Sequence, residues 1–346
     1  MRNYPFDKGK SRCFIVAIGV SHMAINLTDP VFTDESLARD HLENIRWPNG
    51  PVCPHCGGTE RVYRLGGKAH RPGLIHCNDC EGQFTVTTGS VMESSHVPLN
   101  KWVLAFRLMA SSKKGISAHQ LHRTIKVTYK TAWFMAHRIR EAMREEQPAK
   151  LGGEGEIIES DEAYWGPKDK DGNGMNRRRR GKPGKGGKQA ILSLVQRGGG
   201  SRSLVMESLT TKEVFKVLRE NADMKSTLMT DEGTSNNWEF AKHDKVKHGA
   251  KEYVRYDHTY DENNKLLHTK TITTNTVEGF FGVFKRGMRG TYQHCGPQHL
   301  QRYLNEFDFR YSNRAALGVD DTERGTRAIR GAEGKRLTYQ ETSSAK

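Results

Sequence analysis

The sequence lacks any long hydrophobic stretch. No run approaches the roughly 20 apolar residues that a membrane-spanning helix needs, and the mean hydropathy is −0.75. Residues 13–20 follow a basic start and faintly resemble a signal peptide, but Ser21 and His22 end the apolar run and no convincing cleavage site follows. These absences argue against a membrane protein, and we expect a cytoplasmic one.

Acidic residues are too few to balance the basic ones. The 346 residues include 55 lysines and arginines against 40 aspartates and glutamates, which gives a formal net charge of +15. Such an excess predicts attraction to a polyanion, because side chains that neutralise phosphates release counterions. The chain is long enough for two or three domains with full cores.

The most basic segment, 168–188, contains nine basic residues against two acidic ones, interleaved with glycine. It lacks the glycine and lysine register of a nucleotide-binding P-loop, and no Ser or Thr follows Lys188. We interpret it as a mobile loop that follows phosphates beside an active site. The alternative is a solvated linker without a function.

Cysteines are few, but four of the six form the pattern Cys53-x2-Cys56-x20-Cys77-x2-Cys80. Two such pairs at this separation predict a tetrahedral zinc site, and four thiolates leave no open position for water, so the metal is expected to be structural. Two disulfides would require an oxidising compartment, which nothing in the sequence supports. The sequence does not decide whether this ribbon contacts DNA or protein.

Four further residues relate to this pattern. His55 and His76 adjoin the cysteine pairs and are expected to be exposed or to contact phosphate rather than to bind zinc. Cys13 and Cys295 stand alone and are expected to be free thiols.

Breaks in composition divide the chain. A second methionine, Met23, precedes the first ordered pattern, and we expect residues 1–22 to be a loose leader or an artefact of start-site choice. We expect five parts: a poorly ordered leader over 1–29, an N-terminal helix and zinc ribbon over 30–95, a helical segment over 96–150, a catalytic domain over 151–317 and a polar, fraying tail over 318–346.

Residues 98–145 show helical periodicity. Ser117 and Thr128 are expected to cap two helices joined by a short turn, which predicts a helix-turn-helix. Its second helix offers basic side chains to DNA: Lys130, His137, Arg138 and Arg140. The alternative is a helical spacer whose basic residues form a solvated face.

Three carboxylates stand in contexts that suit metal binding. Asp161 ends the run 156–161 and Asp231 ends the run 226–231, both interpreted as strands that close at these residues, whereas Glu278 begins a helical stretch. Such acids can converge on two divalent cations ~3.5–4 Å apart, which clamp the attacking and leaving oxygens of a phosphodiester. Oxygen ligands favour Mg²⁺. Glu162 and Glu232 follow the two aspartates, and alternation allows only one of each pair to face the metals.

The order of elements after residue 150 predicts an α/β domain. Strands are expected over 154–163, 188–197 and 201–209, then a helix over Thr211–Ala222 and a strand over 226–231. This order predicts an RNase H-like fold. Lys285 lies two helical turns after Glu278, on the same face, and is expected to hold the phosphate of the cut strand. A further helix over Pro297–Arg310 is expected to end in a polar segment, to Arg314, that also faces DNA.

These residues, taken in order, resemble bacterial insertion-sequence transposases of the DDE class that carry an N-terminal zinc ribbon. The likeness covers about residues 30–315. The segments that carry it are Trp47–Gly50, Cys53–Cys56, Gln83–Thr85, Thr88–Ser90, Gly115–Ser117, Lys130–Trp133, Asp161–Gly166, Asn275–Gly279 and Tyr303–Arg314.

The resemblance implies a DDE transposase, an enzyme that cuts the ends of an insertion sequence and joins them to target DNA. It implies an RNase H-like catalytic domain, Mg²⁺ or Mn²⁺, recognition of terminal inverted repeats, and a homo-oligomer assembled on DNA in the nucleoid. Asp161, Asp231 and Glu278 would be the metal ligands and Lys285 their basic companion. In related enzymes an asparagine can replace the third acid, so Asn275 is the alternative to Glu278. Two other functions stay open: an RNase H-like nuclease that does not join DNA, and a zinc-ribbon DNA-binding regulator with an inactive transposase-derived domain.

Overall fold

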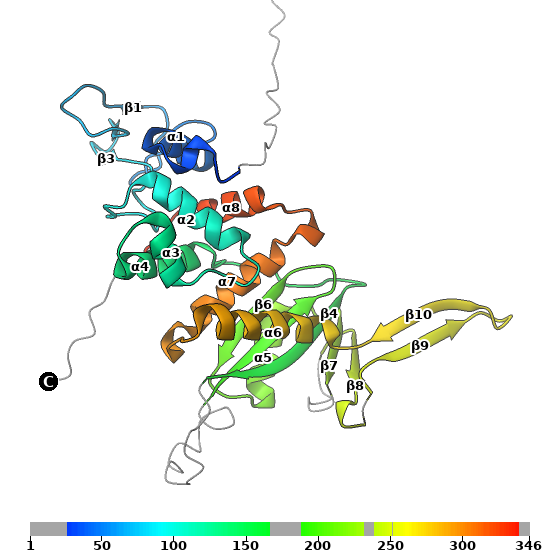
Figure 1. Cartoon of the computed structure of the whole chain (residues 1–346). Helices are drawn as coiled ribbons and strands as arrows, with labels where there is room; N and C mark the ends of the chain where they lie inside the picture. Colours follow the sequence, from blue (N-terminus) through cyan, green and yellow to red (C-terminus); the bar gives the residue numbers. More distant parts are fainter. Residues whose placement is uncertain (1–25, 167–187, 232–238, 251, 339–346) are drawn as a thin grey trace, which may run out of the picture.

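A five-stranded mixed sheet forms the centre of the larger part of the molecule (Figure 1). The structure, a computed structural model, describes residues 26–166, 188–231, 239–250 and 252–338. The strands of this sheet lie in the order β6-β5-β4-β7-β8, in which β5 is antiparallel to β4 and β6, and β7 is parallel to β4 and β8. Their bounds are β4 (Ile157–Trp165), β5 (Gln189–Gln196), β6 (Ser201–Met206), β7 (Thr227–Asp231) and β8 (Lys242–Val246).

Helices cover both faces of this sheet. One face packs against α6 (Asn275–Gly287) and α7 (Leu300–Ser312), whose phenylalanines and leucines meet Ala163, Ile191 and Val195 of the strands. The other face packs against α5 (Thr211–Asn221). Because successive strand residues alternate between faces, odd-numbered residues of β4, β5 and β7 face α6 and even-numbered ones face α5.

The predicted order of elements in this domain is confirmed: three neighbouring strands, a helix and a further strand. The predicted helix at Pro297–Arg310 is also confirmed, as a 3₁₀ turn followed by α7. Its expected DNA-facing end is wrong for Arg310, which is buried against Glu306, whereas Arg314 is half-buried and donates to the carbonyl of Gly199. The basic loop expected over 168–188 and the candidate Glu232 lie outside the described residues, apart from Lys188.

The N-terminal part of the chain is built around a second core. It contains α1 (Glu35–Arg46), α2 (Leu99–Ser111), α3 (Ala118–Ile125), α4 (Tyr129–Ala142) and the small ribbon strands β1 (Val62–Arg64), β2 (Ile75–Cys77) and β3 (Gln83–Phe84). Asp34 caps α1 by accepting from the amides of Ser36 and Leu37. The ribbon and the helices share one continuous buried cluster, so the parts expected over 30–95 and 96–150 are packed as a single body.

The chain from Gly318 to Thr338 is not a fraying tail, which corrects that prediction. Asp320 caps α8 (Asp321–Arg330), and this helix lies against α2 in the N-terminal part (Figure 1). Ala328, Ile329 and Ala332 are buried in the N-terminal core. The segment is polar in composition because its other face carries charged residues, and its apolar residues recur at helical spacing.

The two predicted helix caps in the helix-turn-helix are confirmed. Ser117 accepts from the amide of Gln120 and Thr128 from that of Thr131, and Lys126 turns the chain between α3 and α4 in the left-handed conformation. These geometries reproduce the short turn of a helix-turn-helix.

The expectation that α4 presents four basic residues to DNA is wrong for three of them. His137, Arg138 and Arg140 are buried, and only Lys130 is exposed. Arg138 donates to the carbonyl of Glu93, and Arg140 pairs with Glu306 of α7 at 2.7 Å. These side chains hold the structure together rather than face solvent.

Arg140 belongs to a buried charged network that joins α4 to α7. Glu306 is fully buried and accepts from Arg140, from Arg310 and from the hydroxyl of Tyr292. Gly115, in the loop before α3, has φ +87° and an added Cβ would lie 1.8 Å from that hydroxyl. A side chain at Gly115 would therefore disrupt this junction between the two parts of the molecule.

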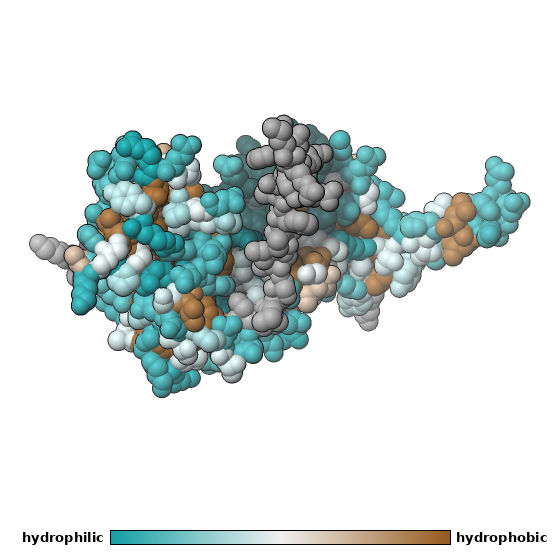
Figure 2. Space-filling view, turned by 90° about the horizontal axis from the view of Figure 1, so that it is seen from above, coloured by the Kyte–Doolittle hydropathy of each residue, from teal (hydrophilic) through white to brown (hydrophobic). Residues whose placement is uncertain are grey.

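A two-stranded hairpin that the sequence did not predict projects from the sheet (Figures 1 and 2). It consists of β9 (Arg255–Tyr260) and β10 (Leu266–Ile272) and leads directly into α6. Lys270 pairs with Asp244 of β8, which fastens the base of the hairpin to the sheet edge. The remaining short turns are η1 (Pro30–Phe32), η4 (His248–Ala250), η5 (Met288–Tyr292, of π type), η6 (Pro297–His299) and η7 (Ala315–Leu317).

Within the ranges that the structure describes, no helix has the length and apolar character needed to cross a bilayer.

A partly buried carboxylate on α7 predicts a measurable pH effect. Asp308 accepts from Ser201 Oγ at 2.7 Å and from the Ser203 amide at 2.8 Å, and burial raises its pKa to about 6 from 3.8. Because the pKa is raised on folding, its stabilising contribution is complete below about pH 4 and is lost as pH rises through 6. We expect Asp308→Asn, which mimics the neutral acid, to gain up to ~3 kcal/mol relative to wild type between pH 4 and 7. Urea unfolding at several pH values measures this difference, and a pH-independent difference would contradict it.

Candidate functional site

Asp161 and Asp231 lie on neighbouring parallel strands. Glu159 of β4 is in register with Met229 of β7, and each aspartate follows two residues later on its own strand. Both therefore point to the sheet face that α6 covers. Asp231 ends β7 as predicted, but β4 continues to Trp165, so the expectation that Asp161 closes its strand is wrong.

Glu278 lies in the first turn of α6, over the same face of the sheet. Its backbone amide donates to the carbonyl of Thr274 at 3.1 Å, and its Oε1 accepts from the hydroxyl of Thr274 at 3.1 Å. These contacts direct the carboxylate of Glu278, an exposed residue, back toward the beginning of the helix.

Electrostatics shows that the three acids are neighbours. The pKa of Asp161 is raised to about 6, mainly by burial and in addition by the negative charges of Asp231 and Glu278. The amide of Glu162, at 2.8 Å, and the ammonium group of Lys285 act in the opposite direction. We call Asp161, Asp231 and Glu278 the acidic site; its concentrated negative charge is what a bound cation would neutralise.

The two companion residues are placed differently. Lys285, in the last turn of α6, is close enough to Asp161 to lower its pKa, and its Nζ lies 5.4 Å from the ring centroid of Phe281. Asn275 is the first residue of α6 and is exposed. Its backbone amide donates to Thr273 Oγ1 at 3.2 Å. The structure therefore brings Lys285, together with the acids, to one face.

Glu162 lies on the opposite face of β4 from Asp161 by strand alternation. Burial raises its pKa to about 7, with further contributions from Asp161 and Asp231. This geometry favours Asp161 over Glu162 as the residue that faces Glu278.

The acidic site provides only carboxylate oxygens, which suits Mg²⁺ or Mn²⁺. Across the described ranges, the four cysteines form the one set of three or more Cys, His, Asp or Glu side chains whose ligand atoms lie within 4.8 Å of one another. The three acids are thus more widely spaced. That spacing is compatible with two ions that keep several waters, because the ligands then occupy different sides of an ion pair ~3.5–4 Å long.

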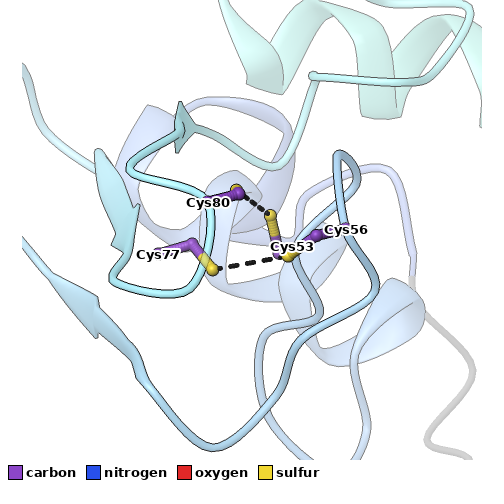
Figure 3. Close-up of side chains that lie close together, drawn as sticks. All are labelled: Cys53, Cys56, Cys77 and Cys80. Atoms are coloured by element: carbon purple, nitrogen blue, oxygen red, sulfur yellow. Dashed lines mark hydrogen bonds between the residues drawn. The ribbon is translucent and has the colours of Figure 1, made fainter.

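The four cysteines converge from two loops (Figure 3). The sulfurs of Cys53 and Cys80 are 3.6 Å apart, and so are those of Cys56 and Cys77. A disulfide would bring them to ~2.05 Å, whereas a tetrahedron with Zn–S bonds of ~2.3 Å has edges of ~3.8 Å. The cluster therefore has the dimensions of a structural zinc site.

Local turns hold the cysteines in place. The amide of Gly57 donates to the carbonyl of Cys53 at 2.9 Å, and Gly57 has φ +78°, which favours glycine. In the second loop, the amide of Cys77 donates to the carbonyl of Gly82 at 2.9 Å, and an added Cβ at Gly82 would lie 3.1 Å from the sulfur of Cys80.

The histidines beside the cysteines are not part of the cluster. His55 is exposed, as expected, but His76 is largely covered, with its ring 5.3 Å from that of Tyr63. Cys295 is a free thiol, as predicted, and Cys13 lies outside the described residues.

Sequence reasoning missed Glu159 and Arg197. Glu159 is fully buried on β4 and accepts from the amides of Thr276 and Val277, the second and third residues of α6. The signal was present, since Glu159 precedes Asp161 by two residues and so shares its face of a buried strand. Arg197, the last residue of the strand expected over 188–197, pairs with Glu159 at 2.6 Å, and the sequence gave no sign of this pairing across 38 residues.

Comparisons with known proteins agree with this arrangement of a zinc ribbon before a mixed α/β domain. Residues 33–83 match the transposase zinc-ribbon domain, and residues 150–312 match the ISXO2-like transposase domain. The chain is therefore similar to a transposase zinc ribbon in its N-terminal part and to a transposase domain in the part that follows. The first match includes all four cysteines of the cluster, and the second includes the whole acidic site and Lys285.

A relative from Halobacterium salinarum, described as an uncharacterized protein in transposable element ISH50, is 28% identical over 293 residues. The alignment covers 81% of this chain and 91% of the relative. The relative is archaeal, so the expectation of a specifically bacterial protein gains no support from it.

Proposed function

We propose that this protein is a DDE-type transposase that cuts the ends of an insertion sequence and joins them to target DNA. The observation that carries the proposal is the acidic site, which places Asp161, Asp231 and Glu278 on one face of the sheet inside a transposase domain. The sheet order, with an antiparallel second strand and a parallel pair after a helix crossover, supports an RNase H-like fold.

In the proposed reaction, water attacks a phosphodiester at the element end and releases a 3′-hydroxyl. That hydroxyl then attacks a target phosphodiester, joins to its phosphorus and releases a target 3′-hydroxyl, without a covalent protein intermediate. Asp161, Asp231 and Glu278 would hold Mg²⁺ or Mn²⁺, which would activate the attacking oxygen and stabilise the leaving one.

The chain's own residues have separate roles in this proposal. Asp161, Asp231 and Glu278 hold the metals, with Glu278 preferred to Asn275 because a carboxylate binds Mg²⁺ better than an amide. Lys285 neutralises the phosphate of the cut strand, and its charge acts on Asp161 already in the free protein. The net charge of +15 draws double-stranded DNA to the protein. The partners are the terminal inverted repeats, target DNA in the cytoplasm, and further copies of this chain assembled on the DNA.

The proposal is tested with purified full-length protein, Mg²⁺ and a duplex carrying the DNA that flanks its gene. We expect nicked and joined products that depend on the metal. Cleavage without joining would indicate a nuclease, and specific binding without cleavage would indicate a DNA-binding regulator. Either outcome would refute the transposase proposal.

A further inference from the structure

We propose that Glu159 and Arg197 are positioning residues that set the separation of the three acids. This inference rests on the proposed function, because it concerns how the metal ligands are held. Neither side chain belongs to the acidic site itself.

Glu159 determines where α6 begins. The helix has no side-chain cap of its own at Thr274, so its first amides need acceptors from elsewhere. Glu159 Oε2 accepts from the amides of Thr276 at 2.7 Å and Val277 at 3.0 Å, and Oε1 accepts from Thr276 Oγ1 at 2.8 Å. A carboxylate is also favoured there by the helix dipole. A strand residue thus fixes the start of the helix that carries Glu278.

Arg197 connects Glu159 to two further elements. Its Nε donates to Glu159 at 2.6 Å, and its two terminal nitrogens donate to the carbonyls of Thr271 and Thr273 at 2.8 and 2.9 Å. One of them also lies 3.1 Å from the sulfur of Met229 on β7. Arg197 therefore joins β4, β7 and the segment between β10 and α6.

Three residues of this network, one on each element, lie two positions before a member of the acidic site. Glu159 precedes Asp161 by two residues, Met229 precedes Asp231 by two, and Thr276 precedes Glu278 by two. Two residues span ~7 Å along a strand and ~3 Å along a helix. The Glu159–Arg197 pair therefore anchors all three elements immediately before the residue that each contributes.

A purely structural role would give a different result from a positioning role. A structural ion pair stabilises the fold but leaves the metal affinity of a correctly folded variant unchanged. Supporting residues that orient metal ligands typically change metal affinity by roughly 10–100-fold when replaced. Metal binding by the free protein thus separates the two roles without relying on catalysis.

The test measures Mn²⁺ binding to the zinc-loaded, full-length protein by electron paramagnetic resonance, with Asp161→Asn to identify binding at the acidic site. We expect Glu159→Gln to weaken this binding by roughly 10–100-fold, because a glutamine amide cannot accept from two helix amides and Arg197 together. Thr276→Val removes one hydrogen bond to Glu159 and should weaken it about 2–5-fold. Asp308→Asn, which alters a partly buried carboxylate between α7 and β6, is the matched control and should leave binding unchanged.

The outcomes separate the two proposals. Unchanged Mn²⁺ affinity in folded Glu159→Gln, or in Thr276→Val if the first variant does not fold, would overturn the positioning role while leaving the metal site intact. Binding that Asp161→Asn does not reduce, or no binding by wild type, would refute the metal site and with it the positioning role.

Discussion

Asp161→Asn and Asp231→Asn should each lower DNA cleavage and strand transfer by at least about 10³-fold, equivalent to ~4 kcal/mol of transition-state stabilisation. Asparagine keeps the shape of each side chain but removes the negative charge that holds the metal ions. Both steps should be lost together, since the same acids serve cleavage and joining. Product formation on a labelled end duplex measures the loss, while a gel-shift assay should show nearly unchanged end binding.

Glu162→Gln is the matched control for this prediction. It removes a neighbouring partly buried carboxylate from the other face of β4 and should lower activity much less than Asp161→Asn. If the order of the two effects were reversed, Glu162 would be the ligand and the assignment of faces would be wrong. Strand transfer at the wild-type rate in either aspartate variant would refute the acidic site.

Removal of the ribbon zinc should unfold more than the ribbon. Zinc binding to sites of this kind contributes an apparent ~10–16 kcal/mol at neutral pH. Cys53 and Cys77 belong to the same buried cluster as Phe84, Trp102 and Ile329, so the loss should spread into the helical core. We expect Cys77→Ser, or treatment with a strong chelator, to abolish the cooperative unfolding of the N-terminal part and end binding with it.

Thermal unfolding, zinc content and end binding measured on the same samples check this prediction. Cys295→Ser is the control, because this free thiol lies outside the cluster and should leave all three unchanged. Normal folding and DNA binding by zinc-free protein would show that the cysteines do not serve as a structural metal site.

Much of the fold was predictable because the relevant signals are local. The cysteine spacing, the caps at Ser117 and Thr128 and the continuous apolar run of β5 depend on residues close in sequence. The hairpin of β9 and β10 escaped prediction because its strands expose both faces, so their sequences show neither a buried run nor a clear alternation. The end of β4 was misplaced because a charged residue in mid-strand resembles a terminus.

The residues of the acidic site could be predicted from the sequence, but the buried residues that hold its elements in place could not. Basic residues on α4 looked like a DNA-binding face, yet Arg140 is neutralised by Glu306, which lies 166 residues further along the chain. Glu159 likewise meets Thr276 across 117 residues. A single sequence gives no information on such distant pairings, so it cannot distinguish a buried, paired charge from a solvated one.

The return of α8 to the N-terminal core has a consequence for synthesis of the chain. Ala328, Ile329 and Ala332 complete a core whose other members lie between Val31 and Met143. The ribosome makes the whole sheet domain before it supplies these residues. The ribbon and helical part therefore stays incomplete during translation, and a product truncated within the sheet domain would expose the apolar surface of α2. Full assembly of the N-terminal part thus requires that translation has passed Ala332.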